Sequence, residues 1–120
     1  MSLFTKKTAG LPSEERPWLK YYGRDAVKAA FPGCTVFDMM YEANKTHPGD
    51  IAINYFGNRI SYGQLFDEID KAARAYTALG VKKGDTVMIC AYNTPENIYS
   101  LYALDRLGAV LNPVDPQIGA

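Results

Sequence analysis

The residues of this chain that could do chemistry are few and far apart. Its single histidine, His47, stands directly before a Pro-Gly pair, and histidine is the commonest general base near neutral pH. Because this position lies between a predicted helix and a turn, we expect a surface histidine that ends the helix, rather than a catalytic base. The two cysteines, Cys34 and Cys90, form no CxxC pair. With one histidine they do not make a recognisable zinc site.

A basic turn and a glycine-containing run are the candidate phosphate sites. Lys82 and Lys83 are adjacent and could hold a phosphate, but we favour a solvated turn that leads into a buried strand. Neither GxGxxG nor GxxxxGK[ST] occurs, and no GxSxG sequence is present. The run Thr8–Ser13 contains Thr, Gly and Ser, but it follows no predicted strand and precedes no lysine. We therefore do not interpret it as a phosphate-binding loop.

Two further residues occupy a place where ligands often bind. Asn93 and Glu96 come directly after a predicted buried strand, and ligands bind at the carboxyl ends of parallel strands. The alternative, which we favour, is that both residues serve the start of the next helix. The acidic pairs Glu14-Glu15 and Asp67-Glu68 are expected to face solvent. From the residues alone we therefore assign no catalytic, cofactor-binding or metal-binding residue.

Composition limits the class of protein. The 120 residues suffice for one domain or a piece of one, and 48% hydrophobic with 22% charged residues is typical of a globular chain. Thirteen acidic residues balance thirteen basic ones, so no nucleic-acid partner is indicated. The opening MSLFTKK lacks the apolar run of a signal peptide, and no stretch approaches a membrane span of about 20 apolar residues. We expect a cytoplasmic protein.

The elements that position these residues can be predicted from capping and periodicity. Thr35 and Asp38 predict the start of an amphipathic helix over 36–45. Alternating residues predict strands over 51–56 and 59–62, joined by a two-residue turn at Gly57-Asn58. Ser61 and Gln64 form a capping box for the next helix.

That next helix carries the clearest pattern in the chain. Its apolar residues recur every three or four positions and form one stripe: Tyr62, Leu65, Phe66, Ile69, Ala72, Ala73, Tyr76 and Leu79. Asp67–Lys71 and Asp70–Arg74 are expected to pair on the exposed face, and Gly80 is expected to end the helix in a left-handed conformation.

The remaining segments complete an α/β order. Residues 86–92 are apolar on both faces, which is typical of a parallel strand covered by helices. Thr94-Pro95 predicts the start of a nearly all-apolar helix over 95–107, and a strand over 109–112 is expected to end at Pro113. The fold class is therefore α/β: a hairpin followed by βαβαβ, with right-handed crossovers in one sheet. The aromatic cluster of the first 34 residues, within RPWLKYYG, is expected to pin an N-terminal arm to the body. The alternative is that this cluster is a partner-binding motif.

The order of short motifs resembles that of a known family. ISYGQL at 60–65 resembles the [hydrophobic]-[Ser/Thr]-Tyr-x-Glu-Leu motif of the adenylate-forming enzymes, which include acyl-CoA synthetases, luciferases and peptide-synthetase adenylation domains. GVKKGDTV at 80–87 resembles the G-V-x-x-G-D-x-V of that family, and 103–113 resembles its second motif, a helix, a glycine and a strand that ends in proline. Asp115-Pro116 stands where many members have Asn-Pro. The segment 35–57 is similar to the usual lead-in of the family, and RPWLKYY is similar to the arm of fatty-acid–CoA ligases, which favours an acyl-CoA synthetase.

The resemblance, which covers roughly residues 35–117, carries implications for function. Members activate a carboxylate with ATP, form an acyl-adenylate and release pyrophosphate, and most then transfer the acyl group to a thiol such as coenzyme A. The phosphate loop, the nucleotide motifs and the catalytic lysine of the family have no matching positions in this chain. We therefore expect an N-terminal arm over 1–34 and the first part of the AMP-binding N-terminal domain over 35–120, with no cofactor of its own and no activity alone. ATP, Mg²⁺ and coenzyme A are implied for the full-length parent, and a small carboxylic acid is its implied substrate.

The partner implied for such a fragment is the rest of the parent ligase. An unsatisfied sheet edge and the uncovered face of the helix over 95–107 also predict self-association. The alternative is a free-standing, non-catalytic α/β interaction or regulatory module, which would be a monodisperse monomer. A third hypothesis is a nucleotide-binding domain of unfamiliar type.

Overall fold

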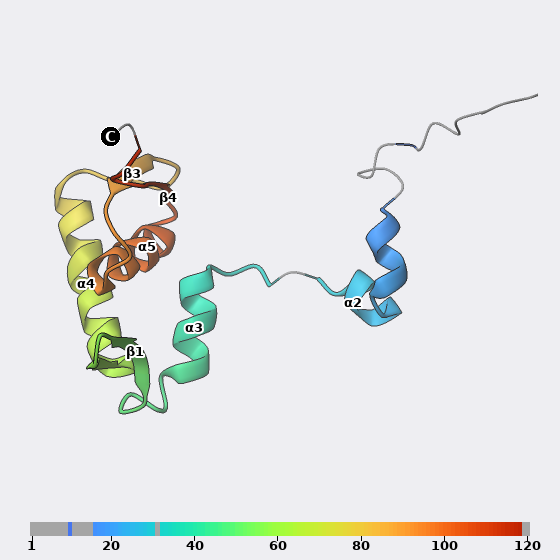
Figure 1. Cartoon of the computed structure of the whole chain (residues 1–120), viewed down its shortest axis with the longest axis horizontal. Coiled ribbons are helices and arrows are strands. Elements are labelled where there is room, and N and C mark those ends of the chain that lie inside the picture. The colour runs from blue at the N-terminus through green and yellow to red at the C-terminus, as the bar shows by residue number, and fades with distance from the viewer. Residues whose placement is uncertain (1–9, 11–15, 31, 119–120) are drawn as a thin grey trace, which may run out of the picture. The chain divides into compact units, whose positions relative to one another are not determined.

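The computed structural model describes residues 10, 16–30 and 32–118 (Figure 1). The chain divides into two compact units, residues 1–33 and 34–120. The first contains a 3-10 helix, η1 (Pro17–Tyr21), and a short helix, α2 (Arg24–Lys28). Whether the aromatic residues of η1 attach this unit to the body stays a prediction. Among the described residues, no helix combines the length and the apolar character needed to cross a bilayer.

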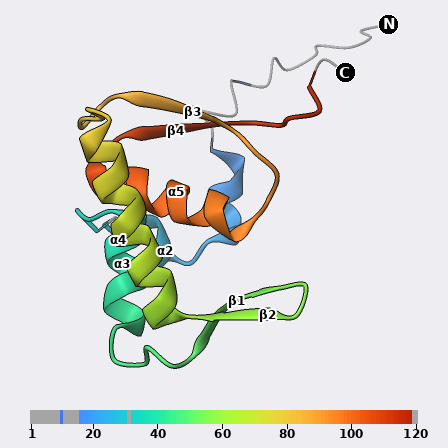
Figure 2. The same ribbon diagram turned by 90° about the vertical axis from the view of Figure 1, so that its left-hand side faces the viewer.

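The second unit is built around three helices, α3 (Val36–Asn44), α4 (Tyr62–Ala78) and α5 (Pro95–Leu107). α5 packs against both α4 and α3. Their apolar stripes meet in the core, where the side chains of Ile69 and Leu104 are 0% exposed. The other buried apolar residues among those described are Phe37, Ile60, Leu65, Ala73, Pro95 and Ala103. Two small sheets lie at opposite ends of α4 (Figure 2).

α3 begins as its sequence predicts and is fixed to α5. Thr35 and Asp38 form a capping box, with hydrogen bonds of 3.0 and 3.1 Å. The backbone N–H of Phe37 donates to Asp105 Oδ2 on α5 at 2.7 Å, and the Arg106 guanidinium lies 5.4 Å from the centre of the Phe37 ring. A charge-assisted bond to an otherwise free N-terminal N–H ties the two helices together.

α4 confirms most of its sequence pattern. Ser61 and Gln64 form the predicted capping box, and Gly80 has a φ of 89°. Leu79, expected on the apolar stripe, is instead 79% exposed. It lies at the C-cap, beyond the last residue of the helix.

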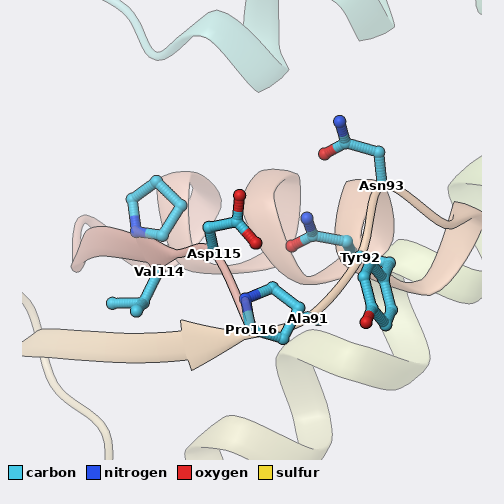
Figure 3. A pocket seen from close by; sticks show the side chains of 8 residues that line it. Ala91, Tyr92, Asn93, Val114, Asp115 and Pro116 are labelled. Atoms are coloured by element: carbon cyan, nitrogen blue, oxygen red, sulfur yellow. The ribbon is translucent and has the colours of Figure 1, made fainter. Parts of the chain in front are cut away.

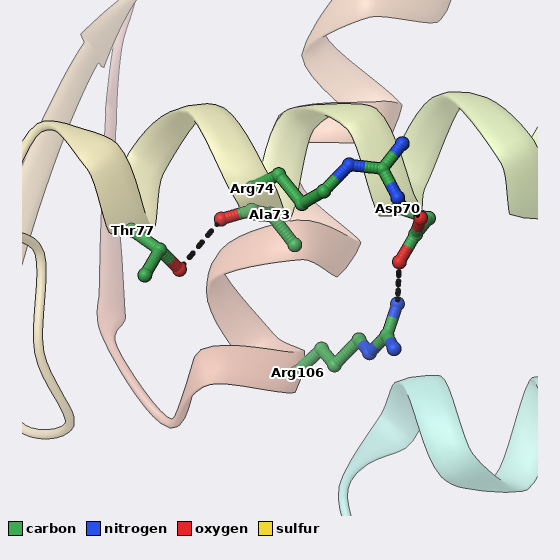
Figure 4. A network of polar contacts seen from close by, with 5 residues as sticks. All are labelled: Asp70, Ala73, Arg74, Thr77 and Arg106. Carbon is green, nitrogen blue, oxygen red and sulfur yellow. Dashed lines mark hydrogen bonds and ion pairs between the residues drawn. The ribbon is translucent and has the colours of Figure 1, made fainter.

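The charged face of α4 pairs differently from the prediction at one position. Asp70 binds Arg74 as expected, and its other oxygen accepts a hydrogen bond from Arg106 of α5 at 3.0 Å (Figure 4). The predicted pair Asp67–Lys71 is wrong, because Lys71 binds Glu68 at 2.7 Å. Residues three and four apart both lie within reach on a helix surface, so spacing alone did not decide between the two acids.

The hairpin consists of β1 (Ile51–Tyr55) and β2 (Asn58–Ser61). Its turn lies one residue earlier than predicted, at Phe56-Gly57, since Tyr55 pairs with Asn58. Both turn residues have positive φ, 49° and 88°, as a type I′ turn requires. The Asn54 side chain accepts a hydrogen bond from the Gly57 N–H at 3.2 Å, which supports this unusual conformation of Phe56.

β3 (Thr86–Cys90) and β4 (Val110–Val114) form the second sheet and run parallel. The α/β class and the order of elements are confirmed, but the strands form two separate two-stranded sheets. The predicted crossover from the hairpin into one common sheet is therefore absent from the described residues: the hairpin and the β3–β4 pair lie at opposite ends of α4 (Figure 2). The prediction that helices cover both faces of β3 is also wrong, because the Met88 side chain is 68% exposed.

β4 continues through Pro113, where the sequence predicted its end. The Val110 N–H donates to the Asp85 carbonyl at 2.7 Å. Successive residues of a strand direct their N–H groups to opposite sides, so the nitrogen of Pro113 faces away from β3. Proline is tolerated at such a free edge because the ladder loses no hydrogen bond.

Candidate functional site

A hollow lies at the carboxyl ends of β3 and β4. It has a volume of about 290 Å³ and is lined by the loop after β3, the first turn of α5 and the end of β4. Figure 3 shows Asn93 and Asp115 contributed by the connections that follow the two strands. Polar side chains therefore gather at the edge of a parallel sheet where ligands usually bind. The lining residues are Ala91, Tyr92, Asn93, Asn97, Pro113, Val114, Asp115 and Pro116.

Local sequence builds this edge from two turns. The Thr94 N–H donates to the Tyr92 carbonyl at 2.8 Å, and this hydrogen bond forms a tight turn directly before Pro95, the first residue of α5. After β4, the Asp115 carboxylate accepts a hydrogen bond from the Gln117 N–H at 2.9 Å, and this Asx-type turn holds Asp115 beside the hollow.

Asn97 provides the most informative atom of the hollow. Its side-chain oxygen is buried and accepts no hydrogen bond from any described residue. Leaving such an acceptor without a donor costs about 1–3 kcal/mol. A hydrogen-bond donor that reached this oxygen would offset that cost. The chemistry of the lining, one carboxylate and two carboxamides, suits hydrogen-bond donors.

The two residues that the sequence placed at this edge are separated by the structure. Asn93 lines the hollow, whereas Glu96 belongs to a different surface depression that also contains Glu68 and Tyr99. The Thr94 hydroxyl and the Glu96 backbone N–H lower the pKa of the Glu96 carboxyl. Burial, with the nearby charges of Glu96 and Glu68, raises the pKa of Tyr99. Glu96 thus has the environment of a helix-start carboxylate, as the favoured alternative expected.

The other candidate residues lie outside the hollow. His47 is exposed in the turn after α3, where its Nδ1 lies 2.9 Å from the Thr46 hydroxyl. Lys82 and Lys83 are exposed, and the Lys82 N–H donates to the Asp85 carboxylate at 2.8 Å, which closes their turn.

Both cysteines are exposed free thiols. The run Thr8–Ser13, apart from Gly10, and the pair Glu14-Glu15 lie outside the described residues. Among the residues that are described, no three His, Cys, Asp or Glu side chains are placed to hold a metal ion.

Sequence reasoning missed Asn97 and Asp115. Asn97 is the third residue of α5. Because the sequence pattern of this helix is apolar nearly all round, it did not indicate a ligand-facing side chain at Asn97. Asp115 was noted only as a variant of an Asn-Pro motif. A usable signal existed in both cases, because each polar residue follows a strand that the sequence itself predicts to be parallel.

Comparison with solved structures defines the class of fold. The N-terminal subdomain of Klebsiella oxytoca NpsA, solved in complex with anthranilyl-AMSN, is similar with a TM-score of 0.67 and 27% identity, over 70% of this chain and 22% of that chain. A Mycobacterium tuberculosis fatty acyl CoA synthetase gives a TM-score of 0.66 and 27% identity, over 70% of this chain and 17% of that one. The fold is that of part of the N-terminal domain of adenylate-forming enzymes.

Sequence comparison then gives the family. Residues 40–120 match the AMP-binding enzyme family, and the chain belongs to it. The acetyl-coenzyme A synthetase of Streptomyces avermitilis is 34% identical over 110 residues, a match that covers 88% of this chain and 16% of the synthetase. The chain thus spans about a sixth of the length of this relative. The resemblance stated from the motifs is confirmed.

Proposed function

We propose that the chain is the N-terminal scaffold of an ATP-dependent, AMP-forming carboxylic acid–CoA ligase. In this reaction a carboxylate oxygen attacks the α-phosphorus of ATP, and the bond to pyrophosphate breaks. The thiolate of coenzyme A then attacks the acyl carbon of the adenylate, and AMP leaves. The observation that carries the proposal is the family match over residues 40–120, supported by a relative named as an acetyl-coenzyme A synthetase.

The phosphate groups of ATP and coenzyme A, which the family implies, do not fit the hollow at the β3–β4 edge. The hollow at the β3–β4 edge is lined by one carboxylate and contains no lysine, arginine or histidine, whereas phosphates in protein sites are bound by cations and backbone N–H groups. We therefore propose that the phosphate groups of ATP and coenzyme A, with the Mg²⁺ that accompanies the phosphates of ATP, bind to parts of the parent other than this hollow. On this proposal the chain alone forms no acyl-adenylate.

The reading frame that encodes the chain offers the first test. The proposal expects translation to continue past Ala120 and to reach, within about fifty codons, a Ser/Thr/Gly-rich loop followed by lysine. Sequencing the transcript and measuring the mass of the endogenous protein checks this. A stop codon directly after Ala120, together with a monodisperse endogenous protein of 13.3 kDa, would instead support the free-standing α/β module.

We also propose that the isolated chain self-associates and that the protein is cytoplasmic. Met88 and Val110 expose 68% and 54% of their surface on the β3–β4 sheet, and exposed apolar residues on a sheet favour association. Two unpaired thiols suit a reducing compartment. Fluorescence microscopy of a tagged full-length protein tests the location: signal confined to the secretory pathway would contradict it.

A further inference from the structure

Phe56 occupies a position of the hairpin turn that disfavours a large side chain. It is the first of the two turn residues, and its φ of 49° lies in the left-handed region. Glycine, asparagine and aspartate are the usual residues there, because a bulky side chain crowds its own backbone in that conformation. The turn alone would therefore be more stable with a smaller residue than phenylalanine.

The described residues give the Phe56 ring little contact in return. Phe56 is 94% exposed, the largest fraction among the large apolar residues that the structure describes. Of the described aromatic rings, only that of its neighbour Tyr55 lies against it, with the ring centres 4.7 Å apart. The Asn54 side chain accepts the hydrogen bond from the Gly57 N–H at 3.2 Å. That bond holds the backbone of the turn and does not depend on an aromatic ring at residue 56.

The hairpin holds Phe56 in a fixed direction. Ile60 on β2 is buried in the core of the second unit, and Ile53 on β1 packs against that core. Figure 2 shows the closed end of the hairpin directed away from α4. The strands thus form a rigid support that presents the Phe56 ring beyond the core.

The proposed parent contains the chain that could cover this ring. The match to the Streptomyces avermitilis synthetase covers 16% of that enzyme, so on the proposed function most of the parent lies outside these 120 residues. Burial of a phenylalanine side chain is strongly favourable and would offset the strain of the turn. Because this part of the parent is covalently attached, its effective concentration is higher than that of a separate partner.

We propose that apolar side chains of the parent beyond residue 120 bury the Phe56 ring. This inference rests on the proposed function, because it requires the reading frame to continue. It identifies the tip of the hairpin as an anchor between this part of the parent and the remainder. The strain of the turn is present in both the 120-residue chain and the parent, whereas the burial occurs in the parent alone. Replacing Phe56 should therefore have opposite effects on the stability of the two proteins.

The test compares Phe56→Asn in the 120-residue chain and in the longest product of its reading frame. In the 120-residue chain, asparagine tolerates the left-handed backbone, so the thermal midpoint should rise by about 2–4 °C. In the longer protein the loss of the buried ring should exceed that gain, and the midpoint should fall by at least about 2 °C. Circular dichroism in dilute solution measures both midpoints.

Asn54→Ala is the matched control. It removes the acceptor of the Gly57 N–H, a hydrogen bond made within the hairpin. This contact is the same in the two proteins, so the variant should lower the midpoint in both.

Thiol labelling at residue 56 gives a second readout that does not depend on a change in stability. The thiol of Phe56→Cys should react with an alkylating reagent in the folded 120-residue chain about as fast as in the unfolded chain. In the folded longer protein it should react at least about tenfold more slowly than in the same protein unfolded. Mass spectrometry of the peptide that contains residue 56 follows the reaction at this thiol alone.

The outcomes separate this inference from the proposed function. A reading frame that stops directly after Ala120 overturns both. Where the frame continues, a midpoint that Phe56→Asn raises in both proteins, or labelling that is equally fast in both, overturns only the Phe56 contact. A midpoint that Phe56→Asn lowers in the 120-residue chain also overturns it, because the ring would then be held within these residues.

Discussion

The helical layer and the β3–β4 sheet of this chain differ in how completely they are packed. α4 and α5 bury Ile69 and Leu104 fully; a capping box begins α4, and the left-handed Gly108 ends α5. The sheet contains no fully buried residue: Thr86, Met88 and Cys90 face solvent on β3, as does Val110 on β4. The helices therefore form the buried core of the second unit, whereas the sheet presents a surface that another element could cover. This difference suits a scaffold that serves a larger enzyme.

The largest expected effect tests the packed side of this comparison. Ile69→Ala removes a side chain that is 0% exposed, and a cavity in the helical layer should lower the free energy of unfolding by about 2–5 kcal/mol. The matched change Met88→Ala, on the sheet, should cost less than about 0.5 kcal/mol in the monomer. Urea denaturation of dilute protein measures both, and equal losses would remove the distinction between the two regions.

The second prediction concerns the contact that fixes α3. Asp105→Ala leaves the part-buried Phe37 N–H without its acceptor at 2.7 Å, and the loss should be about 1–3 kcal/mol. Asp105→Asn retains an acceptor oxygen and serves as the control, with a smaller loss. Hydrogen exchange should locate the change in the first turn of α3. Unchanged exchange there would show that the bond does not hold the helix.

A third prediction tests the turn where the helical layer meets the sheet. Gly108 has a φ of 69°, and an added Cβ would lie 3.0 Å from Lys83 Cγ, whereas Gly80, with a φ of 89°, has open space. Alanine at either position should cost about 1–2 kcal/mol for the left-handed backbone. Gly108→Ala should cost slightly more, and shortening Lys83 in a second variant should remove the excess. An excess that persists would mean that crowding by Lys83 is not its cause.

The smallest effect is expected for the ion pair between α4 and α5. Asp70 and Arg106 side chains are 39% and 43% exposed, so water screens their attraction. A double-mutant cycle with Asp70→Asn and Arg106→Gln should give a coupling of about 0.2–1 kcal/mol. One molar salt should reduce it; a coupling insensitive to salt would point to packing of Arg106 on Phe37 instead.

Local signals predicted the helices better than the sheets. Ser61, Gln64 and Gly80 gave α4 its bounds because caps and periodicity act within a few residues. The exposure of β3 and the length of β4 depend on tertiary packing, which the local sequence pattern does not encode. The apolar residues of β3 indicated cover on both faces, but nothing local showed that the described chain covers one face only. Pro113 was interpreted as a strand end, because the direction of its nitrogen depends on pairing with β3.

The candidate site was predicted only in part for the same reason. Asn93 was placed at the correct edge by its position after a strand. Asn97 and Asp115 join it because a helix turn and a second strand bring them there, and such convergence requires the parallel register of β3 and β4. Each motif that identifies the family is a short run of consecutive residues across a helix, a turn or the adjoining strand. The motifs were therefore visible in the sequence although the site was not.

Carboxylate-dependent exchange of labelled pyrophosphate into ATP tests the central claim most directly. It should be measured with Mg²⁺ and a panel of short- and long-chain carboxylic acids, on the purified 120-residue chain and on the longest product of its reading frame. We predict exchange by the longer protein and none by the 120-residue chain. The scaffold account would be contradicted if the 120-residue chain catalysed exchange, provided that this activity copurified with the chain and was lost when the chain was unfolded.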